Sequence, residues 1–344
     1  MGSTNLKAID FFCSGGGMTY GLRQAGIDVI AGIDNDEDAK KTYEHNNPGS
    51  KFILEDVFEL EEEELKQEIK IKENDDDLIL VGCSPCQYWS IINTDKTNSS
   101  KSKDLLKEFH RFVKFYNPGY VVVENVPGLE LRQEESGLKE FIDDLESRGY
   151  TVAFDVYNLN EYNVPQSRRR FSLIASRVTT EKIIPEKSSQ KPKVKHVIGE
   201  EKGFYKVKAG HRDKTKFQHT VAGLQKKNLE VIKNTPKNGG NSVKKRESYR
   251  GSGFQDSYSR MSWDKPAPTI TTRFFSFSNG RFGHPEEHRA ISLREGATLQ
   301  TFPKDYYFDA NSIAAIAKMI GNAVPPEFAR RIGQAIIEKA EEND

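Results

Sequence analysis

The sequence predicts an α/β fold in which a doubly wound, mainly parallel sheet is joined to a second, smaller domain. Short apolar runs alternate with helix-like segments over about the first 175 residues, and this alternation is typical of a parallel sheet covered by helices. A glycine-rich turn directly follows the first apolar run, as at many strand-to-helix cofactor sites. After residue 177 the periodicity fades into lysine-rich sequence, which indicates a second domain.

Each expected strand is a short apolar run, and each expected helix has apolar residues at helical spacing. In chain order the strands are expected at residues 7–12, 28–33, 77–81, 120–124, 151–159 and 169–175. The helices are expected at residues 19–25, 37–45, 61–71, 105–116 and 136–147. Residues 93–104 are rich in Ser, Asn and Lys, so a polar surface loop is expected there.

Three segments define the expected domains. Residues 1–176 form a catalytic and cofactor-binding domain, residues 177–290 form the second domain, and residues 291–344 return to complete the first. Helical patterning resumes at residues 293–300 and 312–320. Pro325 and Pro326 then stand in the first turn of a further helix, where proline is favoured.

Opposite charges are concentrated in two parts of a chain whose formal net charge is zero. Residues 55–77 hold 12 acidic side chains against 3 lysines, and residues 176–250 hold 20 basic side chains against 7 acidic ones. A basic stretch of this size favours a polyanionic partner such as nucleic acid. The alternative is a solvated lysine-rich face.

Composition argues against several classes of protein. No apolar run approaches the roughly 20 residues of a membrane span, so no membrane association is expected. Three cysteines are too few for a disulfide framework, which favours a reducing, intracellular compartment. A zinc site would need about four ligands, so no metal is expected. A redox role for the pair Cys83 and Cys86 is the remaining alternative, but such motifs usually sit in domains of about 100 residues.

The turn at residues 12–17 carries the predicted cofactor site. Its glycines let a ligand approach the backbone closely at the start of a helix. Asp34 ends the next strand, where a carboxylate can accept hydrogen bonds from ribose hydroxyls. The turn lacks the Lys-Ser/Thr ending of a phosphate loop and the full dinucleotide pattern. It therefore favours a nucleoside cofactor without pyrophosphate, such as S-adenosylmethionine, over a plain tight turn.

Three reactive groups follow predicted strands. Cys86 comes after the apolar run ending at Val81, and a thiolate at the carboxyl end of a strand is a strong nucleophile. Glu124 ends a run of three valines, where an ionised carboxylate is costly unless partnered; the alternative is a surface strand end. Arg168 and Arg170 are expected on one side of an extended chain, either at the active site or in a phosphate-binding stripe.

The ordered set of motifs resembles the DNA (cytosine-5) methyltransferase family of the bacterial modification-methylase type, over nearly the whole chain. The matching positions are the turn at 12–17, Asp34, Asp56, Pro-Cys-Gln at 85–87, Glu-Asn-Val at 124–126, Gln-Ser-Arg-Arg-Arg at 166–170, Arg-Glu-Gly-Ala-Thr-Leu-Gln-Thr-Phe-Pro at 294–303 and Ile-Gly-Asn-Ala-Val-Pro-Pro at 320–326. Two positions depart from the family pattern. Ser14 replaces the first glycine of the turn, and Trp89 replaces the commoner phenylalanine.

The resemblance implies a class I, Rossmann-like methyltransferase that transfers a methyl group from S-adenosylmethionine to carbon 5 of a flipped-out cytosine and leaves S-adenosylhomocysteine. Cys86 would bond to carbon 6, Glu124 would hydrogen-bond or protonate N3, and Arg168 would bind O2. Residues 177–290 would read the DNA sequence, and residues 93–104 would close over it. The implied cofactor-binding residues are Phe12, Ser14, Gly15, Gly17, Asp34, Asp56, Pro85 and Asn322. The implied substrate-binding residues are Gln87, Ser90, Gln166 and Arg170.

The resemblance also implies partners. Double-stranded DNA is the expected substrate of a monomeric, cytoplasmic enzyme associated with a bacterial nucleoid, with a cognate restriction endonuclease acting on the same site. One alternative is an RNA (tRNA) cytosine-5 methyltransferase, whose branch typically carries Pro-Cys-Gln-Pro-Phe-Thr where this chain has Pro-Cys-Gln-Tyr-Trp-Ser. Another is a catalytically silent DNA-binding relative, which would usually have lost the Cys, Glu or Arg positions.

Overall fold

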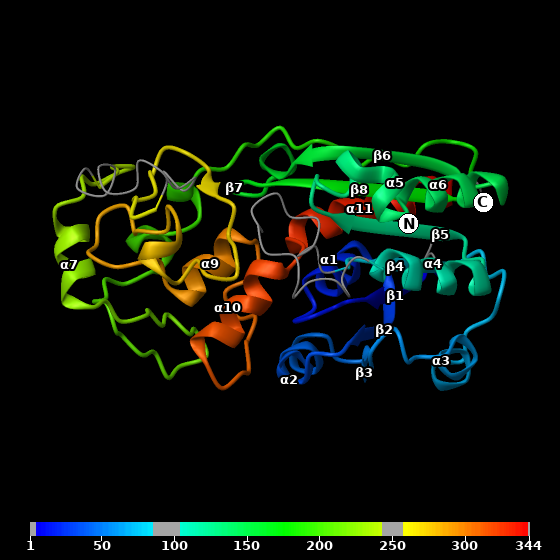
Figure 1. Cartoon of the computed structure of the whole chain (residues 1–344), viewed down its shortest axis with the longest axis horizontal. Coiled ribbons are helices and arrows are strands. Elements are labelled where there is room, and N and C mark those ends of the chain that lie inside the picture. Colours follow the sequence, from blue (N-terminus) through cyan, green and yellow to red (C-terminus); the bar gives the residue numbers. More distant parts are fainter. Residues whose placement is uncertain (1–4, 85–103, 243–256, 343–344) are drawn as a thin grey trace. The chain divides into compact units, whose positions relative to one another are not determined.

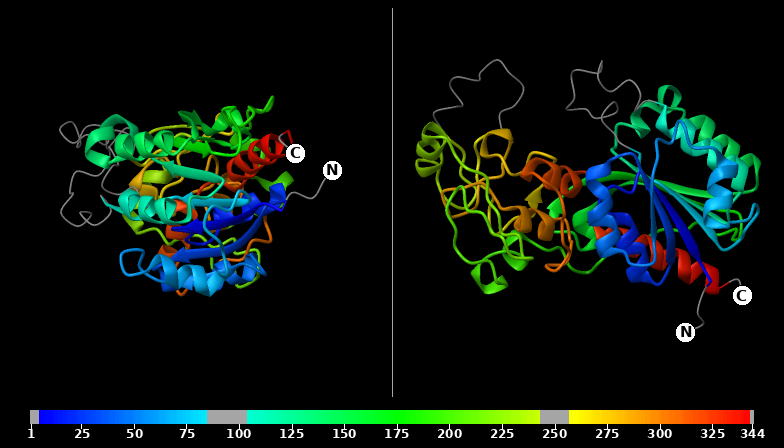
Figure 2. Two further views of the ribbon diagram at one scale, coloured as in Figure 1. Left: turned by 90° about the vertical axis from the view of Figure 1, so that its right-hand side faces the viewer. Right: turned by 90° about the horizontal axis from the view of Figure 1, so that it is seen from below.

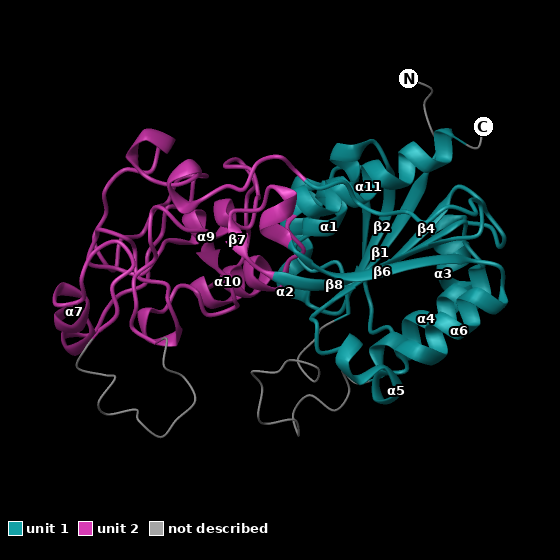
Figure 3. Ribbon diagram, turned by 90° about the horizontal axis from the view of Figure 1, so that it is seen from above, with its two compact units in different colours: residues 1–158, 169–187, 326–344 teal, residues 159–168, 188–325 magenta. Residues whose placement is uncertain are grey.

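A computed structural model describes residues 5–84, 104–242 and 257–342. The chain divides into two compact units, coloured separately in Figure 3. The first unit comprises residues 1–158, 169–187 and 326–344, and the second comprises residues 159–168 and 188–325. These limits differ from the predicted ones. Residues 291–325, expected in the catalytic domain, belong to the second unit, as do residues 159–168.

A seven-stranded sheet forms the centre of the first unit, in the order β3-β2-β1-β4-β5-β8-β6. Its strands are β1 (Lys7–Phe11), β2 (Asp28–Asp34), β3 (Lys51–Leu54), β4 (Leu78–Gly82), β5 (Tyr120–Asn125), β6 (Thr151–Asn158) and β8 (Arg169–Ser176). Strands β1 to β5 pair in parallel, whereas β8 runs antiparallel to both β5 and β6. The predicted doubly wound, mainly parallel sheet is therefore confirmed.

Helices cover both faces of this sheet, with α1 and α11 on one face and α4 and α6 on the other (Figures 2 and 3). The helices of the first unit are α1 (Gly17–Ala25), α2 (Glu37–Asn46), α3 (Glu62–Ile69), α4 (Leu105–Tyr116), α5 (Gln133–Ser136), α6 (Leu138–Ser147) and α11 (Pro326–Glu341). Alternate residues of β1 serve the two faces. Ile9 and Phe11 pack in the core with Phe109 and Phe112 of α4, while Asp10 bonds to Thr19 of α1.

The last helix returns to the N-terminal one, and two glycines allow the contact. A Cβ on Gly21 of α1 would lie 2.2 Å from the carbonyl oxygen of Pro326, and one on Gly333 of α11 would lie 2.7 Å from Cβ of Ala25. No other residue fits at these positions without movement of the backbone. Segments from the two ends of the chain, blue and red in Figure 1, thus complete one unit.

Two expected elements differ from the observed ones. The helix expected at residues 136–147 is two helices, α5 and α6, because Gly137 takes a left-handed conformation with φ of 73°. Strand β3 was not predicted, since it is only four residues long and only three of them, Phe52, Ile53 and Leu54, are apolar. The other predicted strands and helices of the first unit are confirmed to within about two residues at their ends.

The second unit has few regular elements: strands β7 (Gln166–Ser167) and β9 (Ala267–Pro268) and helices α7 (Lys226–Lys233), α9 (Leu293–Leu299) and α10 (Ile313–Asn322). Buried arginines satisfy many of its loop carbonyls. Arg260 donates to the carbonyl oxygens of Ile232, Thr235 and His284. Arg294 donates to the carbonyl oxygens of Phe217, Pro303 and Tyr306. Within the described ranges, none of the helices has the length and apolar character needed to span a membrane.

Candidate active site and cofactor site

The turn after β1 is built from left-handed residues. Phe12, Ser14 and Gly16 have φ of 63°, 46° and 85°, so the chain reverses sharply before α1 begins. The backbone N–H of Ser14 donates to Oδ2 of Asp34 over 2.8 Å, and that of Asp36 donates to Oδ1 over 2.9 Å. The turn and the following strand therefore hold the Asp34 carboxylate in one orientation.

A depression in the first unit brings together three of the eight predicted cofactor-binding residues, Phe12, Asp34 and Asp56. It is lined by Phe11, Phe12, Ile33, Asp34, Asn35, Glu55, Asp56, Val57 and Leu105. Its lining combines apolar side chains with the carboxylates of Asp34, Glu55 and Asp56, which suits an adenosyl group. Oδ1 of Asp56 accepts the backbone N–H of Phe58 over 3.1 Å, so this carboxylate too is oriented by the backbone.

Asp10 caps α1 from the neighbouring strand. Its Oδ2 accepts the backbone N–H and the hydroxyl of Thr19 over 3.1 and 2.7 Å, whereas Gly16 at the helix start has no side chain to do so. Asp10 is fully buried, and no other described residue bonds its Oδ1. Burial raises the pKa of this carboxyl to about 7, with a smaller contribution from Asp34.

The predicted nucleophile, Cys86, follows β4 along the chain. Ser84 is the last residue described there, so Pro85, Cys86, Gln87 and Ser90 lie outside the described residues, as do residues 93–103 of the predicted loop. Burial, followed by the charges of Asp10 and Glu124, raises the pKa of the Cys83 thiol well above its ordinary value. A thiol with a raised pKa is a poor nucleophile, which favours a structural rather than a redox role for Cys83.

Glu124 and Arg170 lie together at the end of β5. Nε of Arg170 is 3.2 Å from Oε1 of Glu124, and both side chains are largely buried, at 13% and 8% exposed. Strand β8 runs antiparallel to β5, pairing Asn125 with Phe171. The first residues of β8 therefore lie beside the last residues of β5, which supplies the partner that a buried carboxylate needs.

Arg168 lies in different surroundings, in the second unit. Its guanidinium donates to the carbonyl oxygens of Ile270, Gly321 and Ala323, and the residue is 1% exposed. Arg168 precedes β8 and follows β7, so the alternation of side chains along one strand does not extend to it. This geometry favours Arg170 over Arg168 as the partner of Glu124.

Two further predicted residues also belong to the second unit. Gln166 is fully buried. Its side-chain Nε2 donates to the carbonyl oxygen of Leu299 and to Oε1 of Gln300, and its Oε1 accepts the backbone N–H of Ile270. These bonds indicate that Gln166 holds β7 to its neighbours. Asn322, the last residue of α10, is exposed. In the first unit, Gly15 and Gly17 are buried in the cofactor turn.

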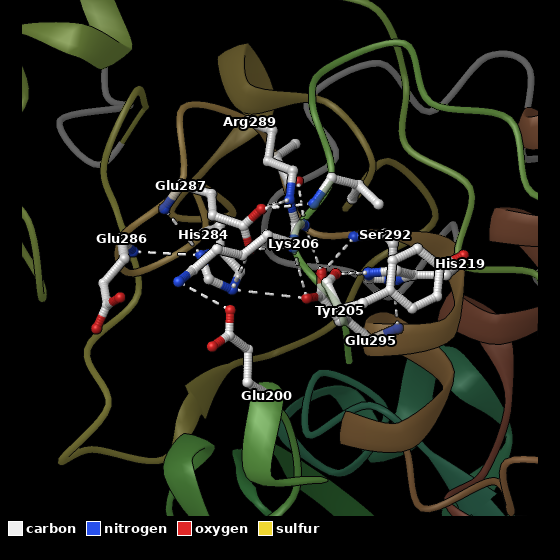
Figure 4. A network of polar contacts seen from close by, with 12 residues as sticks. Glu200, Tyr205, Lys206, His219, His284, Glu286, Glu287, Arg289, Ser292 and Glu295 are labelled. Atoms are coloured by element: carbon white, nitrogen blue, oxygen red, sulfur yellow. Dashed lines mark hydrogen bonds and ion pairs between the residues drawn. The ribbon is translucent and has the colours of Figure 1, made fainter. Parts of the chain in front are cut away.

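A buried polar network in the second unit contains the one group of described residues that resembles a metal site: His284, Glu287 and Glu295 (Figure 4). Arg289 donates two hydrogen bonds to each carboxylate, at 2.7 and 2.8 Å to Glu295 and at 2.7 and 3.1 Å to Glu287. Nδ1 of His284 accepts the backbone N–H groups of Glu286 and Glu287, which places the proton on Nε2. The groups thus satisfy one another as an ion-pair network.

This network also shows how burial and charge compete. Burial alone would raise the pKa of Glu295, but Arg289 lowers it well below its ordinary value. Burial lowers the pKa of His284 to about 4, so this imidazole is neutral at pH 7. A neutral histidine beside one guanidinium that bonds two carboxylates suits a structural role in holding the loops of the second unit together.

Sequence reasoning missed several residues of the site. Asn35, Glu55, Val57 and Leu105 line the nucleoside depression. Asn35 lies near the end of the strand predicted at residues 28–33 and Leu105 starts a predicted helix, whereas Glu55 and Val57 follow β3, which was not predicted. Asn125 was treated only as part of a motif, although its side chain bonds Ser84. For Asn35 and Asn125, the position just after a predicted strand is the signal that could have found them; Glu55 and Val57 carried no such signal.

Comparison with known proteins agrees with this geometry. The family model of C-5 cytosine-specific DNA methylase matches residues 6–338. The chain is 38% identical over 342 residues to the Type II methylase M.HgiDII of Herpetosiphon aurantiacus, covering 95% of this chain and 94% of that protein. It is 30% identical over 337 residues to the Type II methyltransferase M1.HphI of Haemophilus parahaemolyticus, covering 97% and 87%.

Solved structures show the same fold. A prophage-encoded E. coli protein described as a DNA modification methyltransferase has a TM-score of 0.75 at 21% identity, covering 98% of this chain and 99% of its own. The S. pombe Dnmt2 methyltransferase has a TM-score of 0.63 at 17% identity, covering 98% of each chain. At these identities the likeness concerns the fold alone, whereas the sequence match is specific: the chain belongs to the family of C-5 cytosine-specific DNA methylases.

Proposed function

We propose that this methyltransferase transfers the methyl group of S-adenosylmethionine to carbon 5 of cytosine in duplex DNA through a covalent bond to Cys86. The observation that carries the proposal is the pairing of Glu124 with Arg170 at the end of β5. Strand β4, which leads into the Pro-Cys-Gln motif, is the direct neighbour of β5 in the sheet. An acid, a guanidinium and the chain segment with the nucleophile thus start from adjacent strand ends.

The nucleoside depression supports S-adenosylmethionine as the cofactor. Phe12 offers an aromatic ring to the adenine, Asp34 offers a carboxylate held by two backbone amides to the ribose, and Asp56 lies in the same lining. Ser14 keeps the left-handed conformation of the glycine it replaces, so the turn retains its course. When bound, S-adenosylmethionine supplies an electrophilic methyl group; its spent form is S-adenosylhomocysteine.

The proposed chemistry starts with addition of the Cys86 thiolate to carbon 6 of cytosine. The new S–C bond moves the electron pair of the C5–C6 double bond onto carbon 5, which becomes nucleophilic. Glu124 hydrogen-bonds or protonates N3 and so draws electrons from the ring during the addition. After carbon 5 is methylated, it loses its proton to a base or water, and the electron pair restores the double bond as Cys86 leaves.

We assign O2 recognition to Arg170 rather than to Arg168. The guanidinium of Arg170 already contacts Glu124, so a base bound by Glu124 lies within reach of it. Arg168 is committed to three backbone carbonyls, and its removal would disturb the second unit. Gln166 belongs with Arg168 in this structural role.

DNA contact is the proposed role of the second unit. Asp213 organises one of its loops, because its carboxylate accepts the backbone N–H groups of Thr215 and His219, each over 2.8 Å. The basic side chains around it are exposed, and within the described ranges no acidic partner is seen for Lys208, Arg212, Lys214 or Lys216. Such side chains suit phosphate contacts, which position a protein on DNA.

The substrate cytosine must leave the base stack before Cys86 can reach carbon 6, which costs a few kcal/mol. The loop at residues 93–104 is proposed to close over the DNA, with Gln87 and Ser90 near the extruded base and Pro85 near the cofactor. Asn322 is proposed for the methionine end. We further propose a monomeric, cytoplasmic, nucleoid-associated enzyme with a cognate restriction endonuclease.

A trapping experiment tests the function directly. Duplex DNA containing 5-fluorocytosine should form a covalent adduct with the protein in the presence of S-adenosylmethionine, because fluorine cannot leave carbon 5 as a proton does. The C86A variant should form no adduct and should still bind DNA and cofactor. The matched control C83S should retain the adduct. Adduct formation by C86A, or reaction with tRNA instead of duplex DNA, would contradict the proposal.

A further inference from the structure

Asn125, the last residue of β5, reaches across the sheet to the chain that leaves β4. Its Nδ2 lies 3.2 Å from the carbonyl oxygen of Ser84 and 3.0 Å from the Ser84 hydroxyl. Ser84 is followed directly by Pro85 and Cys86. One buried amide thus bonds the residue that stands two positions before the proposed nucleophile.

The orientation of this amide is determined by the backbone. Oδ1 of Asn125 accepts the backbone N–H of Val126 over 2.8 Å, which leaves Nδ2 facing Ser84. Asn125 is 2% exposed, so water does not compete for its bonds. On the other side, the backbone N–H of Cys83 donates to the carbonyl oxygen of Phe11 in β1 over 3.3 Å. The end of β4 is therefore held from both neighbouring strands.

We propose that Asn125 is a positioning residue for the methyl-transfer reaction, which fixes Ser84 so that the Pro85-Cys86 segment starts from a defined place beside Glu124. The inference rests on the proposed function, because it assigns Asn125 a role through Cys86. Among the described residues, the side chain of Asn125 bonds Ser84 and Val126. Its role is to reduce the number of positions open to the nucleophile before the base arrives.

The neighbouring residues Glu124 and Asn125 have different partners: Glu124 contacts Arg170, and Asn125 bonds Ser84. In the pairing of β5 with β8, Glu124 lies opposite Ser172 and Asn125 opposite Phe171, and successive side chains leave a strand in opposite directions. The acid is thus held by Arg170 while the amide bonds the end of β4. Since both residues stand on the same rigid strand, they fix the acid and the start of the nucleophile segment relative to one another.

The test compares rates of adduct formation on duplex DNA containing 5-fluorocytosine at saturating S-adenosylmethionine. N125A should slow the adduct about 100-fold, the loss expected from a misplaced reacting group, with the KM for S-adenosylmethionine and the Kd for DNA unchanged. S84A removes one of the two acceptors and should slow it about 5- to 10-fold. S84T keeps the hydroxyl and should retain the original rate.

A double variant separates positioning from general stability. If Asn125 acts through Ser84, adding S84A to N125A should not lower the rate of adduct formation any further. If the two substitutions instead caused independent structural defects, their fold-losses in rate would multiply. N160A is the matched control, because Asn160 is also buried and its Nδ2 donates to two acceptors, the carbonyl oxygens of Val164 and Pro192. N160A should form the adduct at the original rate.

The outcomes distinguish this inference from the proposed function. If the unaltered protein forms no adduct, the proposed function itself is overturned. If it forms the adduct and N125A does so at the same rate, only the positioning role is overturned. Should N125A fail to fold, S84A and S84T decide: a slow S84A beside a normal S84T supports the role, and equal rates in the two contradict it.

Discussion

The guanidinium of Arg170 lies 3.2 Å from the carboxylate of Glu124, although 46 positions separate the two residues along the chain. The antiparallel course of β8 causes this contact, because it places the beginning of that strand beside the end of β5. Arg168, only two positions earlier, bonds loop carbonyls in the second unit instead. Two arginines of one motif therefore serve different purposes.

Substitution of the two arginines should separate these purposes. R170A should abolish most methyl transfer. It should also lower the melting temperature, because the Glu124 carboxylate stays buried without the guanidinium, and this loss of stability should largely disappear in the double variant E124Q/R170A. R168A should lower the free energy of unfolding by about 3 kcal/mol or more, since three buried carbonyls lose their donor. Single-turnover methylation and thermal unfolding measure the two effects, and the opposite pattern would contradict the assignment.

Asp10 should make stability depend on pH. Burial raises its pKa from 3.8 to about 7, so its contribution to the free energy of unfolding is complete below about pH 4 and falls as the pH rises to about 7. D10N can still accept both bonds from Thr19 and does not ionise. Relative to the unaltered protein, D10N should gain stability between pH 4 and pH 7, by up to about 4 kcal/mol.

Urea unfolding of both proteins at pH 5, 6, 7 and 8 measures this difference. The change should level off above pH 7, where Asp10 is ionised in the folded and unfolded states alike. A difference that stays constant over the whole range would show that Asp10 keeps the same protonation state throughout.

The packing of α11 on α1 should not tolerate a methyl group at Gly21. In G21A the new Cβ would lie 2.2 Å from the carbonyl oxygen of Pro326, so the helices must separate. We expect a loss of about 2 kcal/mol in the free energy of unfolding, which outweighs the roughly 1 kcal/mol gained in helix propensity. The control is G223A, because a Cβ there meets no atom within 4 Å. Equal melting temperatures for the two variants would contradict the packing.

The basic side chains near Asp213 should contribute to DNA binding through phosphates. K208A and K214A should each weaken binding to all duplex sequences similarly, and each should reduce the slope of log K against log salt by about 1. K139A is the control, because Lys139 pairs with Glu134 in the first unit. Titrations of fluorescent duplex DNA at several salt concentrations measure the slopes. An unchanged slope in both variants would show that Lys208 and Lys214 do not contact DNA phosphates.

Much of the fold follows from local patterns. Short apolar runs, glycine at the turn after β1 and proline at the start of α11 determine elements through neighbouring residues. Asp34 could be predicted as part of the proposed cofactor site because the end of a parallel strand is recognisable from the sequence alone. Strand β3 could not be predicted, since three apolar residues are too short a run to mark a strand.

The sequence by itself determined the α/β class, the chemistry of the reactive groups and the family, because these depend on the order of residues and motifs along the chain. Only the tertiary structure decided which arginine faces Glu124, that Gln166 is buried among backbone groups, and that Asn125 bonds Ser84. The physical reason is that strand direction and register arise from packing between segments far apart in the chain. A shift of two residues along the chain exchanges a residue of the site for one of the core.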